Sequence, residues 1–404
     1  MARLSQWIVL VLVVVQAQQL VEGKRYIIKV KPEAIGAPSV DEMFNSAYLQ
    51  FSTLVTEQST KPVIHSRINL ANTLNFVVCE FEPSFAQRMQ KHDAVEYIEE
   101  DLPVKATGPI PTKRQSNGPL GTQASAPSWG LIRISERRPD DTQPFRYPSN
   151  AGSGVTVYVV DTGIDASNVD FGGRASNVFN SVDGETDTDL AGHGTHVSGT
   201  IGGNTYGVAK KVTLKGVKVL DQNGNGQVSN VLAGLEYVLA NNVPGKTVIN
   251  MSISGQFTQS LDDALTQAAS QGVAIVVAAG NTGGNACLNS PGSNSHVLTV
   301  GATDQQDNVA TFSALGKCVD IFGPGVRIMS DWITSNSAIN ILDGTSMAAP
   351  HVTGIAALAL GQQPMSPPAL FAHITSAATT GAIKFNPNNP LSSETPNKLA
   401  YDMV

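Results

Sequence analysis

Four polar residues of the chain have the types and surroundings that nucleophilic catalysis requires. Asp161 ends the apolar stretch of VVDTGID, and His193 lies among glycines in AGHGTHVSGTIGG. Ser346 follows a short turn in DGTSMAAPHVTG, and Asn281 ends the segment VAAGN. They supply a hydroxyl nucleophile, an imidazole base, a carboxylate to orient the base and an amide to hold an oxyanion. This set predicts covalent catalysis by Ser346 if the fold brings the four side chains together.

Each of these residues also has a structural explanation when it is considered alone. Asp161 could cap the turn that follows it, and Asn281 could be an ordinary turn residue. Ser346 opens an apolar helix, where a serine is normally an N-cap. The same helix start leaves unpaired N–H groups beside the hydroxyl, and these can stabilise a developing oxyanion.

The chain has seven histidines, and the neighbouring glycines single out one of them. Gly192 and Gly194 flank His193 and leave its imidazole accessible from one side. His196 lies three positions later and could share that face of a helix, so it is the second candidate for the base.

The surrounding pattern predicts an α/β fold that places these residues at one edge of a sheet. From Trp129 onward, apolar strands alternate with helical stretches, which is typical of a mainly parallel sheet covered on both faces. The predicted strands are residues 154–161, 212–221, 247–254, 273–281 and 296–303, and the predicted helices are residues 228–242 and 258–272. Sites in such folds form beyond the carboxyl ends of the strands, where Asp161, Asp221, Ser254 and Asn281 fall.

The N-terminus predicts a secreted, extracellular protein. Arg3 precedes an unbroken apolar run from Trp7 to Val15, which indicates a signal peptide over residues 1–17, with an end as late as 23. Nine helical residues span roughly 14 Å, well short of the ~30 Å hydrocarbon core, so we expect cleavage and not a membrane anchor.

Two further parts precede the α/β region. Residues 24–105 predict a small α+β module with strands at 25–30, 73–81 and 95–100 and helices at 41–56 and 84–92. Residues 106–120 are polar and rich in Pro and Gly, as in an exposed linker. Lys113-Arg114 within it is a candidate processing site, although a dibasic pair in a linker is often only solvated.

Composition excludes some classes of protein. The 404 residues are 41% hydrophobic and 15% charged, which is too apolar for a disordered chain. The net charge of −7, with no long basic run, argues against nucleic acid as a partner. An oxidising destination favours pairing Cys287 with Cys318, 31 positions apart; two buried thiols are the alternative.

The chain resembles the subtilisin-like serine peptidases, and among them the proteinase K-like branch. The motifs that carry the resemblance, over about residues 120–404, are APSWGLIRIS, DTGI, GHGTHVSGTIGG, AAGN, DIFGPG, GTSMAAPHVTG and TPNKLAYD. Their order Asp, His, Ser is that of the family. The resemblance implies a three-layer subtilisin-like domain over residues 121–404 and an inhibitor-type propeptide over 24–105. It also implies a monomeric endopeptidase that acts on proteins or peptides and is made as an autoprocessed zymogen, with its own propeptide as chaperone and inhibitor.

The resemblance assigns roles to particular residues. Asp161, His193 and Ser346 form the catalytic triad, and Asn281 donates to the oxyanion. The residues implied to bind substrate lie on two strands and one pocket wall: Gly224, Asn225, Gly226, Ser252, Ile253, Ser254, Ala278, Ala279 and Gly280. Cys287 and Cys318 match a disulfide of some relatives, whereas Leu298 stands where a cysteine is common.

The resemblance implies no cofactor for catalysis and one structural calcium ion. Asp320 and the backbone carbonyls of Ser295 and Val297 match the family's ligands, and hard oxygen donors suit calcium. A second family site lacks its usual hydroxyl, because Arg137 stands there. Ser254 replaces a usual glycine beside the specificity pocket, which leaves the preferred P1 side chain open.

Other functions fit the sequence less well. GKT at 245–247 resembles part of a nucleotide-binding P-loop, but Ala240 replaces the required glycine and the motif precedes a strand. A metal hydrolase would need a glutamate beside His193 and His196. A catalytically silent relative is disfavoured because all four catalytic positions are filled.

The N-glycosylation sequon at Asn250 lies in an apolar strand, so we expect no glycan there.

Overall fold

The structure is a computed structural model of the chain, and it describes four stretches: residues 23–32, 62–108, 126–140 and 142–402. Three expectations lie outside these stretches: the signal over 1–17, the helix at 41–56, and most of the linker with Lys113-Arg114. The chain divides into two compact units, Met1–Arg67 with Asn75–Glu100 and Ile68–Leu74 with Asp101–Val404. No helix in the described stretches is both long enough and apolar enough to cross a membrane.

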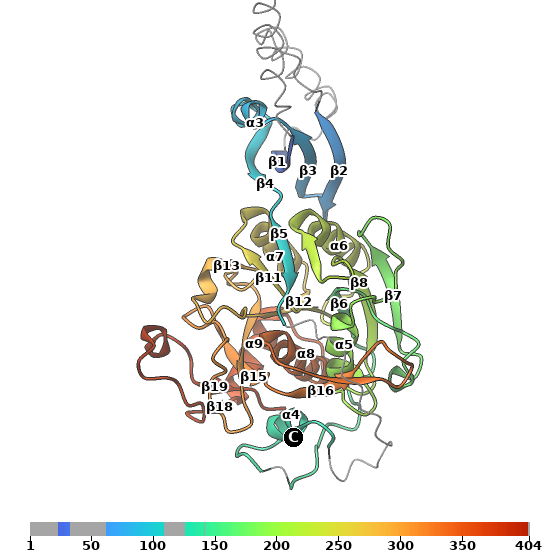
Figure 1. The fold of residues 1–404 in the computed structure, drawn as a ribbon, viewed down its shortest axis with the longest axis vertical. Coiled ribbons are helices and arrows are strands. Elements are labelled where there is room, and N and C mark those ends of the chain that lie inside the picture. The colour runs from blue at the N-terminus through green and yellow to red at the C-terminus, as the bar shows by residue number, and fades with distance from the viewer. Residues whose placement is uncertain (1–22, 33–61, 109–125, 141, 403–404) are drawn as a thin grey trace, which may run out of the picture. The chain divides into compact units, whose positions relative to one another are not determined.

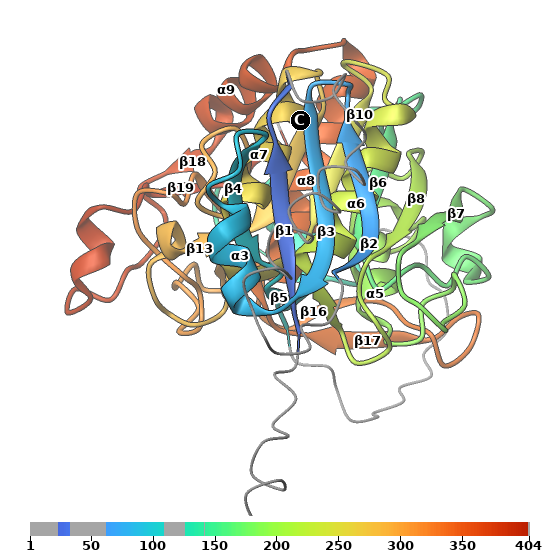
Figure 2. The same cartoon turned by 90° about the horizontal axis from the view of Figure 1, so that it is seen from above.

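The first unit is built on a four-stranded sheet in the order β2-β3-β1-β4 (Figure 2). Its elements are β1 (Lys24–Val30), β2 (Val63–Leu70), β3 (Leu74–Phe81), α3 (Pro83–Met89) and β4 (Val95–Glu100). β1 pairs antiparallel with β3 and β4, and α3 packs Phe85 and Met89 into the apolar core. The predicted strands at 25–30, 73–81 and 95–100 and the helix at 84–92 are all present. β2 was not predicted from the sequence. Buried and exposed residues alternate only weakly along it.

The second unit has a nine-stranded sheet in the order β18-β19-β15-β14-β12-β10-β6-β8-β7. Its strands are β6 (Thr156–Asp161), β7 (Ala175–Asn180), β8 (Thr213–Lys218), β10 (Thr247–Met251), β12 (Ala274–Ala278), β14 (Leu298–Thr303), β15 (Ile321–Pro324), β18 (Thr379–Thr380) and β19 (Lys398–Leu399). Every pair of neighbouring strands between β7 and β19 is parallel, whereas β18 pairs antiparallel with β19. The predicted mainly parallel sheet is confirmed.

Helices cover both faces of this sheet and make it a three-layer structure (Figure 1). α6 (Val228–Ala240) and α7 (Gln259–Ser270) lie on one face, and α5 (His193–Gly202) and α8 (Thr345–Gln362) lie on the other. The other helices are α4 (Trp129–Ser135), α9 (Pro367–Ala377) and the short η2 (Val169–Phe171), η3 (Ala286–Leu288) and η4 (Pro390–Ser393). Small residues let α8 lie close to its neighbours: a Cβ atom on Gly354 would come within 2.4 Å of Val208.

The strand predicted over 247–254 is divided in the structure. β10 stays in the central sheet, whereas β11 (Ile253–Gln256) joins a second sheet in the order β13-β11-β5-β9. The other strands of that sheet are β5 (Pro103–Ala106), β9 (Asn225–Gln227) and β13 (Asn289–Ser290), and β16 (Ile328–Asp331) pairs with β17 (Ile339–Leu342). The break falls at Ser252, whose hydroxyl donates to the backbone oxygen of Ser346 at 3.0 Å. This contact is made across 94 residues, so no local pattern could have predicted the break.

Candidate active site

The predicted catalytic residues lie at the ends of three central elements. Asp161 is the last residue of β6, His193 is the first of α5, and Ser346 is the second of α8. Parallel strands end at one edge of the sheet, and α5 and α8 begin there, so the fold brings the three together. All three residues are at most 1% exposed.

Asp161 and His193 form a buried hydrogen bond between Oδ1 and Nδ1, 2.8 Å long. The same oxygen accepts the N–H of Thr162 at 2.8 Å, which fixes the carboxylate. Burial lowers the pKa of His193, but the charge of Asp161 and this hydrogen bond more than offset it, so the pKa is raised above its ordinary value. Nδ1 is therefore occupied, and Nε2 is the nitrogen that can accept a proton.

His196, the second candidate for the base, points away from this pair. Its Nε2 lies 3.0 Å from the backbone oxygen of Ile328, and its ring packs edge-on against Trp332. Burial lowers its pKa to about 3. His196 is therefore a neutral core residue, and His193 is the histidine placed for proton transfer.

The Ser346 hydroxyl contacts two oxygen atoms of the same unit. It lies 2.9 Å from the backbone oxygen of Ser252, as a donor, and is hydrogen-bonded to the Thr107 hydroxyl. His193 Nε2 is buried and has no hydrogen-bond partner within the described stretches. A Cβ atom placed on Gly108 would lie 3.6 Å from it. Ser346 Oγ and His193 Nε2 therefore lie beside Thr107 and Gly108, the first at the Thr107 hydroxyl and the second near the Gly108 Cα atom.

Asn281 lies just beyond the end of β12 and is oriented by Thr345. The N–H and hydroxyl of Thr345 donate to Asn281 Oδ1 at 2.9 and 2.8 Å. With its oxygen occupied in this way, the amide presents Nδ2 as a donor. A Cβ atom on Gly344 would lie 2.7 Å from the Thr107 carbonyl oxygen and 3.2 Å from Nδ2, so both atoms face Gly344. This is the arrangement that an oxyanion hole needs.

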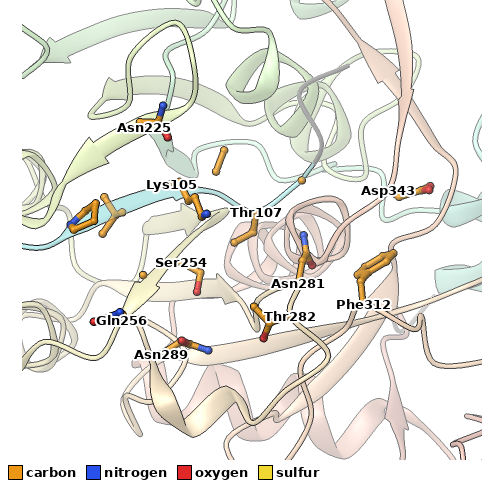
Figure 3. Close-up of a pocket in the computed structure, with 15 residues that line it drawn as sticks. Lys105, Thr107, Asn225, Ser254, Gln256, Asn281, Thr282, Asn289, Phe312 and Asp343 are labelled. Atoms are coloured by element: carbon orange, nitrogen blue, oxygen red, sulfur yellow. The ribbon is translucent and has the colours of Figure 1, made fainter. Parts of the chain in front are cut away.

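β5 lies as an extended strand between β9 and β11 and lines a cleft of about 820 Å³ that also reaches Thr107 and Asn281 (Figure 3). β5 pairs antiparallel with β9 on one side, where Val104 faces Gly226 and Lys105 faces Asn225. It pairs antiparallel with β11 on the other side, where Lys105 faces Ser254. The two strands predicted to clamp a substrate backbone therefore hold a segment of the chain itself.

Two further main-chain hydrogen bonds extend this pairing as far as Thr107, the residue that contacts Ser346. The Ala106 N–H donates to the Gly224 oxygen at 2.9 Å, and the Thr107 N–H donates to the Ser252 oxygen at 3.1 Å. The predicted boundary of the first module at residue 105 thus falls inside β5, and Thr107 belongs to the site and not to a linker. The sequence did not reveal this strand, because its pairing comes from partners more than 100 residues away.

Ala278, Ala279 and Gly280, predicted to form a pocket wall, do not line this cleft themselves. A Cβ atom on Gly280 would lie 3.5 Å from Ser254 Oγ, and Ser254 lines the cleft. Ala278 and Ala279 are buried in two different apolar clusters.

Two supporting residues were missed by the sequence analysis. Thr345 orients Asn281, and nothing in the pattern distinguishes it from other threonines. Asp189 is buried and accepts hydrogen bonds from the Thr162 hydroxyl and from the N–H and hydroxyl of Thr195, which fixes the first turn of α5. An acidic residue just before a helix is a capping signal that could have identified Asp189.

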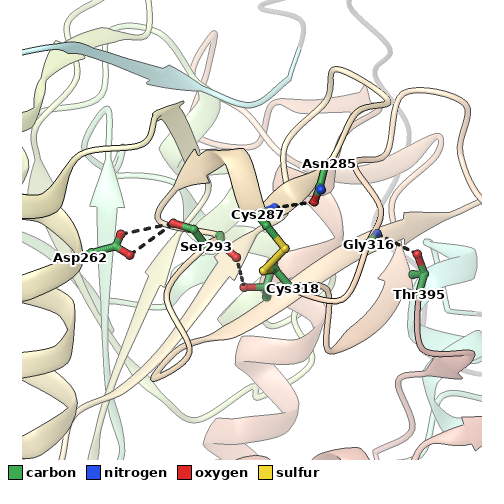
Figure 4. Close-up of a disulfide and its surroundings, with 9 residues drawn as sticks. Asp262, Asn285, Cys287, Ser293, Gly316, Cys318 and Thr395 are labelled. Carbon is green, nitrogen blue, oxygen red and sulfur yellow. Dashed lines mark hydrogen bonds between the residues drawn. A yellow bond between two sulfur atoms is a disulfide. The ribbon is translucent and has the colours of Figure 1, made fainter. Parts of the chain in front are cut away.

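The structure joins Cys287 and Cys318 by a disulfide, with their Cα atoms 5.3 Å apart (Figure 4). The predicted calcium ligands lie nearby in sequence. Asp320 Oδ2 accepts the N–H of Thr299 at 2.8 Å, two residues after Val297. Burial raises the pKa of Asp320 to about 6, so its charge is poorly solvated. A partly buried carboxylate beside carbonyl-bearing backbone fits a hard divalent cation.

Comparisons with known proteins agree on one family. The family model described as the subtilase family matches residues 152–394. "Subtilisin-like protease 2" of Pseudogymnoascus destructans is 47% identical over 273 residues, which are 67% of this chain and 68% of that protein. "Extracellular serine proteinase" of a Thermus species is 44% identical over 324 residues, 78% of this chain and 74% of that one. The crystal structure of a cold-adapted subtilisin-like serine proteinase matches with a TM-score of 0.64 and 40% identity, over 68% of this chain and 98% of the other.

Proposed function

The chain belongs to the subtilase family and is a serine endopeptidase, and we propose that Asp161, His193 and Ser346 are the catalytic triad of a secreted, self-processed enzyme. The hydrogen bond between Asp161 and His193 and the shared edge of the sheet support the triad. Relatives described as extracellular support secretion.

The geometry supports the following roles. The Ser346 hydroxyl turns from Ser252 toward His193 Nε2, gives up its proton and attacks the substrate carbonyl. Asp161 stabilises the imidazolium that results. Asn281 Nδ2 and the Ser346 N–H hold the oxyanion, and the imidazolium then protonates the leaving amine. A water molecule hydrolyses the acyl-enzyme by the reverse sequence of proton transfers.

The strand β5 carries the proposal of self-processing. Its pairing on both sides ends with Thr107, whose carbonyl oxygen faces the same glycine as Asn281 Nδ2. A chain bound in this register presents the Thr107–Gly108 bond for cleavage. The sequence led us to expect the mature domain to begin at residue 121; the geometry favours a first cut after Thr107. The segment that ends there would then occupy the cleft as an inhibitor until it leaves.

A precursor with Ser346→Ala tests this function. We expect the wild-type precursor to yield a chain beginning at Gly108, seen by N-terminal sequencing and intact mass, and the variant to stay uncut. A serine-directed phosphonylating reagent should label Ser346 of the processed enzyme and nothing in the variant. Processing of the variant at the wild-type rate would overturn the triad assignment.

We also propose that Asp320 and the carbonyls of Ser295 and Val297 would hold one calcium ion. The partly buried carboxylate and its raised pKa support this assignment. The ion would supply positive charge that stabilises this carboxylate and ties β15 to the segment before β14, with no part in the chemical step.

A further inference from the structure

The side chain of Thr107 contacts the nucleophile itself. Thr107 Oγ1 is hydrogen-bonded to Ser346 Oγ and also lies 3.2 Å from the Ser252 backbone oxygen, as a donor. Ser346 Oγ makes its own contact with that oxygen at 2.9 Å. Each of the three oxygen atoms, Thr107 Oγ1, Ser346 Oγ and the Ser252 carbonyl oxygen, is therefore in contact with the other two.

The number of hydroxyl protons shared by these three oxygen atoms determines whether Ser346 can donate to His193. Thr107 and Ser346 each carry one hydroxyl proton, and the Ser252 carbonyl carries none. Whichever hydroxyl donates to the other, both protons are used among these three oxygens. Neither proton points to His193 Nε2, which is buried and has no hydrogen-bond partner within the described stretches. In this arrangement the Ser346 proton is not available to the base.

Thr107 is held firmly in this position. Its N–H donates to the Ser252 oxygen at 3.1 Å, the residue before it bonds to Gly224, and its side chain is buried. A β-branched side chain has few χ1 rotamers, so the hydroxyl does not turn away easily. Serine at this position would carry the same hydroxyl with more rotational freedom.

We propose that the Thr107 hydroxyl is a latch that slows cleavage of the Thr107–Gly108 bond by holding Ser346 away from His193. The proposal rests on the proposed function, because it assumes that this bond is cut by the triad. To react, the Ser346 hydroxyl must leave Thr107 and Ser252 and turn to Nε2. Removing the Thr107 hydroxyl while keeping the shape of the side chain removes one of the two hydrogen bonds that hold the Ser346 hydroxyl in place.

The test compares full-length precursors that differ only at residue 107. Thr107→Val has the same shape without the hydroxyl, and we expect its first-order processing rate to rise about two- to tenfold, the factor for loss of one net hydrogen bond. Thr107→Ser keeps the hydroxyl and should process at a rate between those of wild type and Thr107→Val. Equal or slower processing of Thr107→Val, with the cut still after residue 107, would overturn the latch.

A second measurement covers the case in which Thr107→Val folds poorly. Processed wild-type enzyme is given peptide amides with the sequence Pro-Val-Lys-Ala-Xaa, where Xaa is Thr, Val or Ser. The latch predicts a lower kcat for Thr than for Val with a similar KM, and equal kcat values would contradict it. A Ser346→Ala precursor that is still processed would refute the proposed function, whereas an inert Ser346→Ala with no effect at residue 107 would refute the latch alone.

Discussion

The substitution Asp161→Asn tests the mechanism most directly. In the structure Asp161 Oδ1 accepts from the Thr162 N–H and pairs with His193 Nδ1, both at 2.8 Å. An amide keeps the shape of the carboxylate but removes its charge. If its NH2 group faces His193, it donates to Nδ1 and forces the proton onto Nε2, where the ring can no longer act as a base. Asp161 is fully buried, so no solvent replaces the missing charge.

We expect kcat to fall by about 10⁴, the size of the loss when the triad carboxylate becomes an amide in a trypsin-like enzyme. At 1.36 kcal/mol per factor of ten, this is about 5.5 kcal/mol of transition-state stabilisation. The pH profile should also change. Asp161 raises the pKa of His193, and activity requires the neutral ring, so the acidic limb should move to lower pH when the charge is lost.

The assay uses a chromogenic peptide and variant precursor that has been cut in trans by wild-type enzyme and then purified. Ser346→Ala prepared in the same way measures contamination, and the phosphonylating reagent counts active sites. Asp165→Asn is the matched control, because this carboxylate lies four residues later and bonds only to Ser167 in the same loop. If Asp161→Asn kept more than a tenth of wild-type activity, the orienting role would be refuted.

Three further predictions concern neighbouring parts of the domain. Asn281→Ala should lower kcat by about 10²–10³ with little change in KM, as loss of this donor does in a subtilisin; a change confined to KM would place Asn281 in ground-state binding only. Chelation should lower the Tm of processed wild-type enzyme but not that of Asp320→Asn, and an unchanged wild-type Tm would argue against the calcium site. Burial and the neighbouring Asp170 carboxylate raise the pKa of Asp331 well above its usual range, so the folded state keeps a proton that the unfolded chain loses above about pH 4. Stability should therefore fall as pH rises toward the folded pKa, and Asp331→Asn should flatten this dependence in urea unfolding; an unchanged slope would contradict the shift.

The central sheet could be predicted from the sequence because its strands are buried on both faces. β6, β10, β12 and β14 are mainly apolar and buried along almost their whole length, which is the signature of buried parallel strands, and the polar residues that follow or end them stand out. Asp161 and Asn281 were found in this way. Glycines marked His193, and a turn before a helix marked Ser346. The geometry of these residues in the structure agrees with the expected positions.

Features that depend on partners distant in sequence were not predictable. β5 contains Pro103 and no apolar run, and it is a strand only because β9 and β11 supply main-chain partners. The division between β10 and β11 depends on the contact of Ser252 with Ser346. Thr345 and Asp189 matter through the atoms they hold in place, and their residue types occur widely in loops. Local pattern identifies buried strands, whereas these contacts are set by the assembled fold.

The pairing of β5 on both sides also bears on what limits activation. Main-chain hydrogen bonds do not depend on side chains, so β9 and β11 would pair with a substrate backbone in the way they pair with the chain's own β5. Cutting the Thr107–Gly108 bond removes none of the bonds to β9, β11, Gly224 or Ser252. Residues 101–107 should therefore remain in the cleft after the cut, aided by Val104, which is only 2% exposed. Activity would then appear when this segment leaves or is degraded, so cleavage and activation are two separate steps with separate rates.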